Sequence, residues 1–313
     1  MKHLIHRALV FVILVVPAFS FSFNQFPIPS RTIAGNVCTS PDKLYVYFTA
    51  NTTIGRIDLA GNVQEFAVPP FGSLPMGLVG CTFGSDGTLY FGDQNSGRVY
   101  KFNPANQTFV SFGVPAPKAG MAGMVYHVDN VLYIMAASGS QIERMNPDGT
   151  FLPNIVLTAG RWPHGPSSCG GNVWFAENTA NRVAFITPTG FVQEFILPQS
   201  NAKPFATACG SDNGVYFTEN NVSKIGRIDM TSFVIKQWVI PSAASQPRGT
   251  AVSPTMVCFA EYARNKIGCM PLGGSTITEF IVPIASSGPN KLTFGPDGNF
   301  WFSVDNVSYL INH

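Results

Sequence analysis

One short phrase recurs along this chain at a nearly constant spacing. Residues 63–69, 192–198 and 277–283 read VQEFAVP, VQEFILP and ITEFIVP. A second phrase, an aromatic run followed by Lys-Ile-Gly-Arg-Ile, occurs at residues 216–228 and returns in altered form at residues 48–57 and 259–268. Self-similarity at a fixed period constrains the architecture before any single residue is interpreted as chemistry.

Each copy of the repeat is predicted to contain four short strands. The second strand carries an aromatic or large aliphatic residue that marks the period, with steps of 41 to 43 residues. These markers are Phe48, Phe91, Ile134, Phe175, Phe217, Phe259 and Phe302. A period in the low forties with four strands per copy is typical of a β-propeller blade. The sequence therefore predicts an all-β, seven-bladed β-propeller with four-stranded blades.

The composition agrees with an all-β fold. Only 12% of the residues are charged, and the chain contains 30 Gly and 24 Pro. This balance suits many short strands joined by tight turns. Since one blade cannot bury both faces of its sheet alone, we expect all copies to form a single domain.

The first twenty residues differ from the repeat. Lys2 and Arg7 precede an apolar run at residues 8–16, and Ala18 and Ser20 then place small residues at the two positions that a signal peptidase reads. This arrangement predicts a signal peptide over residues 1–20, a propeller domain over 21–313, and a secreted or periplasmic protein. The alternative is a membrane anchor, but the run is shorter than the ~20 residues of a span, so no membrane span is expected after signal removal. The remaining basic and acidic residues balance at 17 each, which argues against nucleic-acid binding.

The two ends of the predicted domain are complementary. Residues 23–29 resemble a fourth strand, and residues 307–311 resemble a third strand. We expect the N-terminal strand to pair into the last blade and close the ring, which removes an unpaired sheet edge. The alternative is an N-terminal segment that is not ordered.

All six cysteines follow the predicted signal peptide, and an even number in an oxidising compartment predicts disulfides. Cys258 and Cys269 flank one predicted hairpin and would face each other. The other cysteines occupy similar positions in successive blades, which predicts the pairs Cys38–Cys81 and Cys169–Cys209. Buried free thiols are the alternative.

The repeat resembles that of the streptogramin B lyases, also called virginiamycin B lyases. Residues 172–198, 214–241 and 295–302 carry the clearest copies, and the resemblance covers nearly all of residues 23–313. The resemblance implies a seven-bladed propeller that opens a cyclic depsipeptide antibiotic at its ester bond by elimination. It also implies a histidine base and a magnesium ion (Mg2+) that polarises the substrate carbonyl.

The family's histidines follow the proline of the innermost strand in the last two blades, and here those positions are Arg248 and Asn290. One Pro-His-Gly phrase occurs, but in the fourth blade, where it contains His164. The second strand of that blade ends in Glu177. We therefore predict His164 and Glu177 as catalytic candidates; the alternative is an ordinary histidine at the channel mouth.

Other polar residues recur near the same rim. Glu177, Glu219 and Glu261 occupy one repeat position, and three carboxylates in a ring are a candidate divalent-metal site. The alternative is a structural role repeated in each blade. Arg161, Arg248 and Asn290 are candidate ligand-binding residues, with solvated charge as the alternative.

These features predict a metal-assisted carbon–oxygen lyase acting on a small cyclic peptide or ester. The alternative is a non-catalytic binding propeller for a protein, peptide or glycan. In either case we expect a monomer, and we expect no cofactor other than possible magnesium.

Overall fold

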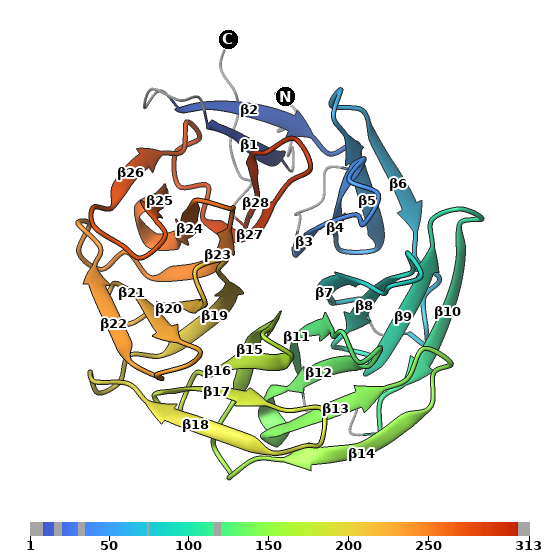
Figure 1. The fold of residues 1–313 in the computed structure, drawn as a ribbon. Helices are drawn as coiled ribbons and strands as arrows, with labels where there is room; N and C mark the ends of the chain where they lie inside the picture. The colour runs from blue at the N-terminus through green and yellow to red at the C-terminus, as the bar shows by residue number, and fades with distance from the viewer. Residues whose placement is uncertain (1–8, 16–20, 31–34, 74, 116–119, 306–313) are drawn as a thin grey trace.

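The structure of the protein is a computed structural model that describes residues 9–15, 21–30, 35–73, 75–115 and 120–305, with side chains from residue 22 on. The described residues form short strands arranged in a ring (Figure 1), with two one-turn 3-10 helices, η2 (Ala137–Gly139) and η3 (Tyr262–Arg264). The all-β propeller prediction is confirmed. In this part of the chain, no helix has the length and apolar character that crossing a membrane requires.

Six sheets each consist of four consecutive strands, paired antiparallel in chain order. The first three are β3 (Val37–Thr39), β4 (Tyr45–Thr49), β5 (Thr53–Asp58) and β6 (Val63–Ala67); β7 (Leu78–Phe83), β8 (Leu89–Asp93), β9 (Arg98–Asn103) and β10 (Thr108–Gly113); and β11 (Met121–Tyr126), β12 (Leu132–Ala136), β13 (Gln141–Met145) and β14 (Phe151–Val156). The next three are β15 (Pro163–Cys169), β16 (Asn172–Glu177), β17 (Arg182–Ile186) and β18 (Val192–Ile196); β19 (Pro204–Cys209), β20 (Gly214–Glu219), β21 (Lys224–Asp229) and β22 (Ile235–Val239); and β23 (Pro247–Val252), β24 (Met256–Glu261), β25 (Lys266–Pro271) and β26 (Thr278–Ile281).

A further four-stranded sheet joins the two ends of the chain in the order β2-β1-β28-β27. It contains β27 (Pro289–Phe294), β28 (Phe300–Val304), β1 (Leu9–Val15) and β2 (Phe21–Pro27). The sequence predicts seven copies, so the count differs in detail: six blades are continuous in the chain, and the closing sheet is composite.

The N-terminal region completes the closing sheet, as predicted, but with two strands instead of one. The third position is taken by β1, which pairs with both β28 and β2. The predicted third strand at residues 307–311 lies outside the described residues. The assignment of residues 1–20 as a signal peptide stays a prediction, although β1 falls within it.

A test of that assignment is a chain that starts at Phe21. We expect it to fold, because β2 contacts the closing sheet through its own side chains: Phe26 stacks on Trp301 at 5.4 Å and Phe23 meets Phe302 edge-on at 6.1 Å. Thermal unfolding followed by circular dichroism would measure the effect. A midpoint that falls by more than about 10 °C would mean that residues 9–15 belong to the folded domain.

The recurring glycine of the third strand has a packing reason. Phe48, Phe217 and Phe259 lie directly opposite Gly55, Gly226 and Gly268 on the neighbouring strand. A Cβ atom at Gly55 would lie 1.9 Å from the Phe48 ring, and one at Gly226 would lie 2.2 Å from the Phe217 ring. The ring therefore covers the glycine backbone, which links the two repeated phrases.

Neighbouring blades bury their apolar faces against each other. Between the fourth and fifth blades, Trp174 and Phe185 belong to the same buried cluster as Phe217 and Ile228. The innermost strands β3, β7, β11, β15, β19, β23 and β27 contact one another in sequence around the centre (Figure 1). They therefore line the central channel.

All three predicted disulfides are confirmed. Cys38–Cys81 and Cys169–Cys209 each join the innermost strands of two successive blades, and Cys258–Cys269 joins β24 to β25. The Cα atoms of the two inter-blade pairs are 5.6 Å and 5.4 Å apart, within the range that a disulfide requires.

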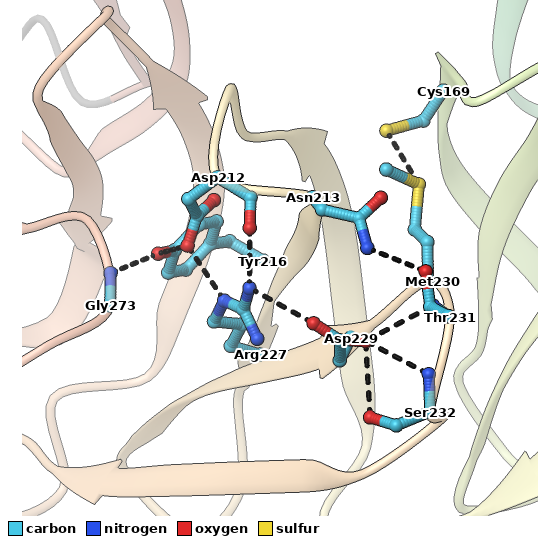
Figure 2. Close-up of polar contacts among 10 residues, drawn as sticks. All are labelled: Cys169, Asp212, Asn213, Tyr216, Arg227, Asp229, Met230, Thr231, Ser232 and Gly273. Atoms are coloured by element: carbon cyan, nitrogen blue, oxygen red, sulfur yellow. Dashed lines mark hydrogen bonds and ion pairs between the residues drawn. The ribbon is translucent and has the colours of Figure 1, made fainter.

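Polar contacts at the face where the innermost strands end also join the blades. In the fifth blade, the Arg227 guanidinium donates to Asp212 at 2.8 Å and also contacts Asp229 at 3.4 Å (Figure 2). The backbone N–H of Gly273, from the sixth blade, donates to the Tyr216 hydroxyl at 2.6 Å. A hydrogen bond therefore joins the fifth blade to the sixth at this face.

Candidate functional site

A β-bulge recurs near the start of six innermost strands. These starts lie at the face of the ring opposite to the face where the strands end. In β15 the register shifts between His164 and Ser167, and the same shift occurs in β7, β11, β19, β23 and β27. Bulges re-aim side chains and are common beside active sites. Here they turn the residues that follow the repeat proline towards the mouth of the channel.

The glycine of the Pro-x-Gly phrase permits close packing at this bulge. A Cβ at Gly165 would lie 2.4 Å from the Phe205 carbonyl oxygen, and one at Gly249 would lie 2.4 Å from that of Asn290. The glycine of the phrase therefore lets neighbouring innermost strands pack closely. In the fourth blade, the middle residue of the phrase is His164, which lines the mouth.

His164 lies at the mouth, as predicted. Its Nδ1 donates to the Phe205 carbonyl oxygen at 2.7 Å, and its ring packs against the Phe205 ring at 4.1 Å. Since Nδ1 is a donor, Nε2 is the acceptor of a neutral imidazole. Burial, followed by the positive charges of Lys291 and Arg248, lowers the His164 pKa to about 3. The imidazole is therefore neutral at physiological pH and a weak base.

Lys291 is the second ionisable group at the mouth, and sequence analysis does not single it out. Its Nζ lies 4.6 Å from the centre of the Phe205 ring. Burial and the positive charge of Arg248 lower the Lys291 pKa to about 8, against a smaller opposing effect of Asp305. Within the described part of the chain, no carboxylate pairs with this amine. A fraction of Lys291 is therefore neutral near physiological pH.

Arg248 and Asn290 are held by one carboxylate. The Arg248 guanidinium forms an ion pair with Asp305 at 3.1 Å and stacks on Tyr262 at 3.3 Å. The Asn290 amide donates to both Asp305 oxygens, at 2.9 Å and 3.0 Å. The Asn290 Oδ1 is buried and accepts no hydrogen bond from the described residues. It is therefore an unsatisfied buried acceptor beside the mouth.

The mouth contains a cavity of about 470 Å³. His164, Asn290 and Lys291 provide its polar groups, together with Asn36, Gln94 and Ser138. Its apolar lining includes Leu78, Val79, Met121, Trp162 and Phe205. Such a mixture of apolar walls and few polar groups is typical of small-molecule sites.

The predicted catalytic pair is separated. Glu177 is not among the residues lining the cavity; it is fully buried at the end of β16, opposite Pro163. Arg161, a predicted ligand-binding residue, is instead bound to Glu194 at 2.9 Å and lies 3.4 Å from Glu177. Both side chains therefore serve the interior of the fourth blade.

The three repeated glutamates do not form a metal site. Among the described residues, no group of three or more His, Cys, Asp or Glu side chains is placed to hold a metal ion. Each glutamate instead points to the fourth strand of its own blade, where its neighbour is Glu194, Gln237 or Glu279. The prediction of a shared site is therefore wrong. Residues at this repeat position are buried inside separate blades and do not converge on the channel axis.

Burial has a strong effect on these carboxyl groups. It raises the pKa of Glu177 to about 8 and that of Glu261 to about 8, with nearby Glu194 and Glu279 adding to the shift. Burial raises the pKa of Glu219 only to about 7, because the Gln237 amide donates to both its oxygens. Glu177 and Glu261 are therefore protonated at neutral pH.

The mouth also does not fit a magnesium ion. Lys291 lines the cavity, Arg248 lies 5.9 Å from the ring of the lining residue Phe205, and Asp305 is already bound by Arg248 and Asn290. Since Mg2+ requires several oxygen ligands and a negative surrounding charge, we derive no step through a metal.

Because the pKa of buried Glu261 is raised, the free energy of unfolding should depend on pH. The folded-state pKa of Glu261, about 8, lies above the ordinary 4.5, so its stabilisation is complete below pH 4.5 and is lost as pH rises through about 8. We expect Glu261→Gln to stabilise the protein at pH 9 by on the order of 2 kcal/mol, and to change little at pH 5. Urea unfolding at both pH values measures this; an equal effect at both would contradict it.

His127 lies away from the mouth. Its Nδ1 is bonded to Ser168 Oγ at 2.7 Å and its Nε2 to the Gly171 carbonyl oxygen at 3.1 Å. Since both partners belong to the fourth blade, buried His127 ties the third blade to the fourth.

Lys291 and Trp162 are the mouth residues that sequence analysis misses. Lys291 occupies the repeat position held by Gly165, Ala206 and Gly249, so the replacement of a small residue is a signal that the sequence does contain. Trp162 directly precedes the repeat proline and exposes 43% of its surface. Its position at the cavity depends on the loop between β14 and β15, which no repeat phrase specifies.

The fold and this mouth define a β-propeller with a compact polar site at one end of its channel. The sequence pattern of the virginiamycin B lyase family matches residues 77–309. The chain therefore belongs to the virginiamycin B lyase family.

Individual relatives agree with this assignment. Virginiamycin B lyase of Nocardia farcinica (strain IFM 10152) is 28% identical over 160 residues, covering 51% of this chain and 53% of that protein. The chain thus aligns with about half the length of this curated relative.

Solved structures extend the likeness over the whole fold. A streptogramin B lyase structure superposes with a TM-score of 0.81 at 24% identity, covering 97% of both chains. Virginiamycin B lyase from Staphylococcus aureus gives 0.76 at 24% identity, covering 88% of this chain and 96% of that one. A catalytically inactive variant of that enzyme with quinupristin gives 0.78 at 22% identity, covering 95% and 99%. At these identities the likeness establishes the fold.

Proposed function

We propose that this protein is a carbon–oxygen lyase that binds a small cyclic depsipeptide or lactone at the channel mouth and opens its ester by elimination. In this proposal Lys291, and not a histidine, removes the proton. The observation that carries it is the Lys291 amine, which lines the cavity without a paired carboxylate among the described residues.

The pKa values favour Lys291 over His164 as the base. A general base acts best when its pKa lies near the working pH. The Lys291 pKa of about 8 meets this condition, whereas the His164 pKa of about 3 does not. His164 Nε2 is instead suited to accept a hydrogen bond from a ligand N–H group.

The proposed step balances without a co-reactant. The neutral Lys291 amine takes a proton from the carbon next to a carbonyl group. A carbon–carbon double bond forms, the bond from the adjacent carbon to the ester oxygen breaks, and a carboxylate leaves. The Arg248 guanidinium lies 5.9 Å from the centre of the Phe205 ring, which Lys291 also approaches, and its positive charge favours the developing negative charge.

A second candidate function is a non-catalytic binding propeller. It is favoured by the weak basicity of His164 and by the engagement of Arg248 and Asn290 with Asp305. Such a protein would hold a cyclic peptide in the same cavity without opening it.

The deciding experiment incubates purified protein with quinupristin and follows the product by chromatography and fragment-ion mass spectrometry. Elimination leaves the mass unchanged, so a new retention time with altered fragments marks ring opening. We expect opening that EDTA does not prevent. Saturable binding without opening at high protein concentration would support the binding propeller instead.

The proposed location of the protein is the secreted or periplasmic fraction. The three disulfides support it, because disulfides persist in oxidising compartments. Immunoblotting of fractionated cells would test it together with the predicted cleavage after Ser20.

Trp162 should contribute to ligand binding at this site. Its half-exposed indole borders the cavity together with His164. We expect Trp162→Ala to raise KM about tenfold, equivalent to about 1.4 kcal/mol, with kcat nearly unchanged, because the indole contacts the ligand and not the transferred proton. Steady-state kinetics with quinupristin measures this; a fall in kcat at constant KM would contradict it.

A further inference from the structure

A second cavity lies between the first and second blades, on the face opposite the mouth. The strand β3 connects the two sites, since Gly35 and Asn36 border the mouth and Ser40 borders this cavity. Its volume is about 500 Å³. We call it the lower groove, and its main side chains are Asp42, Tyr45, Tyr47, Arg56, Phe83 and Asp86.

Three equivalent junctions between other blades are bridged by a polar contact. The Lys101 ammonium donates to the Pro147 carbonyl oxygen of the next blade, and Arg144 donates to that of Pro188 at 3.4 Å. In the fifth blade, Tyr216 instead accepts from the Gly273 N–H, as Figure 2 shows. A contact from one blade to the next blade's turn thus crosses each of these junctions.

The first junction lacks this bridge in the described part of the chain. Arg56 stands at the repeat position of Lys101 and Arg144, but its Nε and Nη2 donate to Gln64 at 3.1 Å and 2.8 Å. Its Nη1 donates to the Tyr47 hydroxyl at 3.3 Å. The basic side chain is therefore held within its own blade, and the groove stays open.

Aromatic rings form the walls of the lower groove. Tyr45 and Phe83 are half-buried, and the buried Tyr47 ring lies between them, 6.2 Å from Tyr45 and 5.1 Å from Phe83. The Cys38–Cys81 disulfide joins the two innermost strands behind these walls. The disulfide therefore restrains the movement of one wall relative to the other, which reduces the entropy cost of binding a ligand.

The charges of the groove restrict what it binds. Asp42 and Asp86 lie exposed at its rim, and Asp42 Oδ2 has no hydrogen-bond partner among the described residues. Arg56 lies 4.4 Å above the Tyr45 ring. The two carboxylates disfavour an anion, and the guanidinium disfavours a cation. Aromatic faces beside free acceptors fit a neutral ring with an apolar face and hydroxyl donors.

We propose that the lower groove binds a neutral oligosaccharide, with a sugar ring stacked on Phe83 or on the face of Tyr45 that Arg56 does not cover, and with hydroxyl groups donating to Asp42. This site is independent of the ester-opening reaction proposed for the mouth, so either proposal can fail alone.

The test is saturation-transfer-difference NMR on the full protein with four neutral probes: cellohexaose, maltohexaose, chitohexaose and mannohexaose. We expect transfer to at least one probe, followed by a calorimetric titration to obtain its Kd. No transfer to any of the four probes at millimolar concentration would overturn the proposal. Binding of a charged probe, such as heparin or hexalysine, in preference to all four would also overturn it.

Variants locate the binding. Tyr45→Ala and Asp42→Ala should each weaken binding at least tenfold, and the exposed Asp42 keeps the test valid if Tyr45→Ala disturbs folding. Tyr126→Ala is the matched control, because Tyr126 holds the position of Phe83 at the next junction, which Lys101 bridges. Unchanged binding in both groove variants, or equal loss in the control, would overturn the assignment of the site.

Discussion

Replacing Lys291 by methionine is expected to lower kcat/KM for ester opening by about 10²- to 10⁴-fold, the usual contribution of a general base. Methionine keeps the length and the apolar contacts of the side chain but cannot accept a proton. The measurement is the initial rate of quinupristin opening. Lys236→Met, which removes an exposed lysine from the outermost strand β22, serves as the matched control and should leave the rate unchanged.

Two further readouts separate a base from a mere positive charge. Lys291→Arg keeps the charge but stays protonated, so it should be as inactive as Lys291→Met. In the native protein, kcat/KM should rise with pH and level off above about 8, where the amine is neutral. A profile that levels off near pH 6.5, or full activity in Lys291→Met, would contradict the assignment.

The same pH range affects the fold. Glu177 and Glu261, with pKa values of about 8, begin to ionise inside their blades as Lys291 becomes neutral. The proposed base therefore becomes neutral in the pH range where the blades lose stability, so the proposed reaction should show its highest sustained turnover near pH 8.

Replacing Phe217 by alanine is expected to destabilise the protein by about 3–5 kcal/mol, the usual cost of removing a core phenylalanine. The Phe217 ring is fully buried between the fourth and fifth blades and covers Gly226 on the neighbouring strand. Its loss leaves a cavity that the rigid blades cannot close. Urea unfolding followed by tryptophan fluorescence measures the change.

The control for this change is Phe191→Ala. Phe191 exposes 58% of its surface in the turn before β18, so its removal should cost less than about 0.5 kcal/mol. Similar losses for Phe217→Ala and Phe191→Ala would mean that the recurring aromatic position is not the core of the blade interface.

The disulfides illustrate how far repeat logic reaches. The equivalent positions of Cys38 and Cys81, and of Cys169 and Cys209, predict pairs between successive blades, and both pairs form. Equivalent positions on the innermost strands lie close together because these strands crowd around the channel axis. The same logic fails for Glu177, Glu219 and Glu261, which lie further out and point into their own blades.

The mouth was only partly predictable. His164 is found from the Pro-His-Gly phrase, and Asn290 from its alignment with that phrase. The role of Lys291 depends on its desolvation beside Phe205 and on the nearby charge of Arg248. Lys291 and these two neighbours come from three different blades, so their combined effect on one amine is not visible in any single repeat.

Phrases repeated at a fixed period predict the all-β propeller, the order of strands within each blade and the two inter-blade cystines, and one hairpin predicts the Cys258–Cys269 pair. The composite closing sheet, the basic mouth and the open lower groove emerge only once the blades are assembled into the ring. Each of these features arises where the sequence differs from the repeat pattern. The effect of such a difference depends on side chains that the ring brings together from different blades.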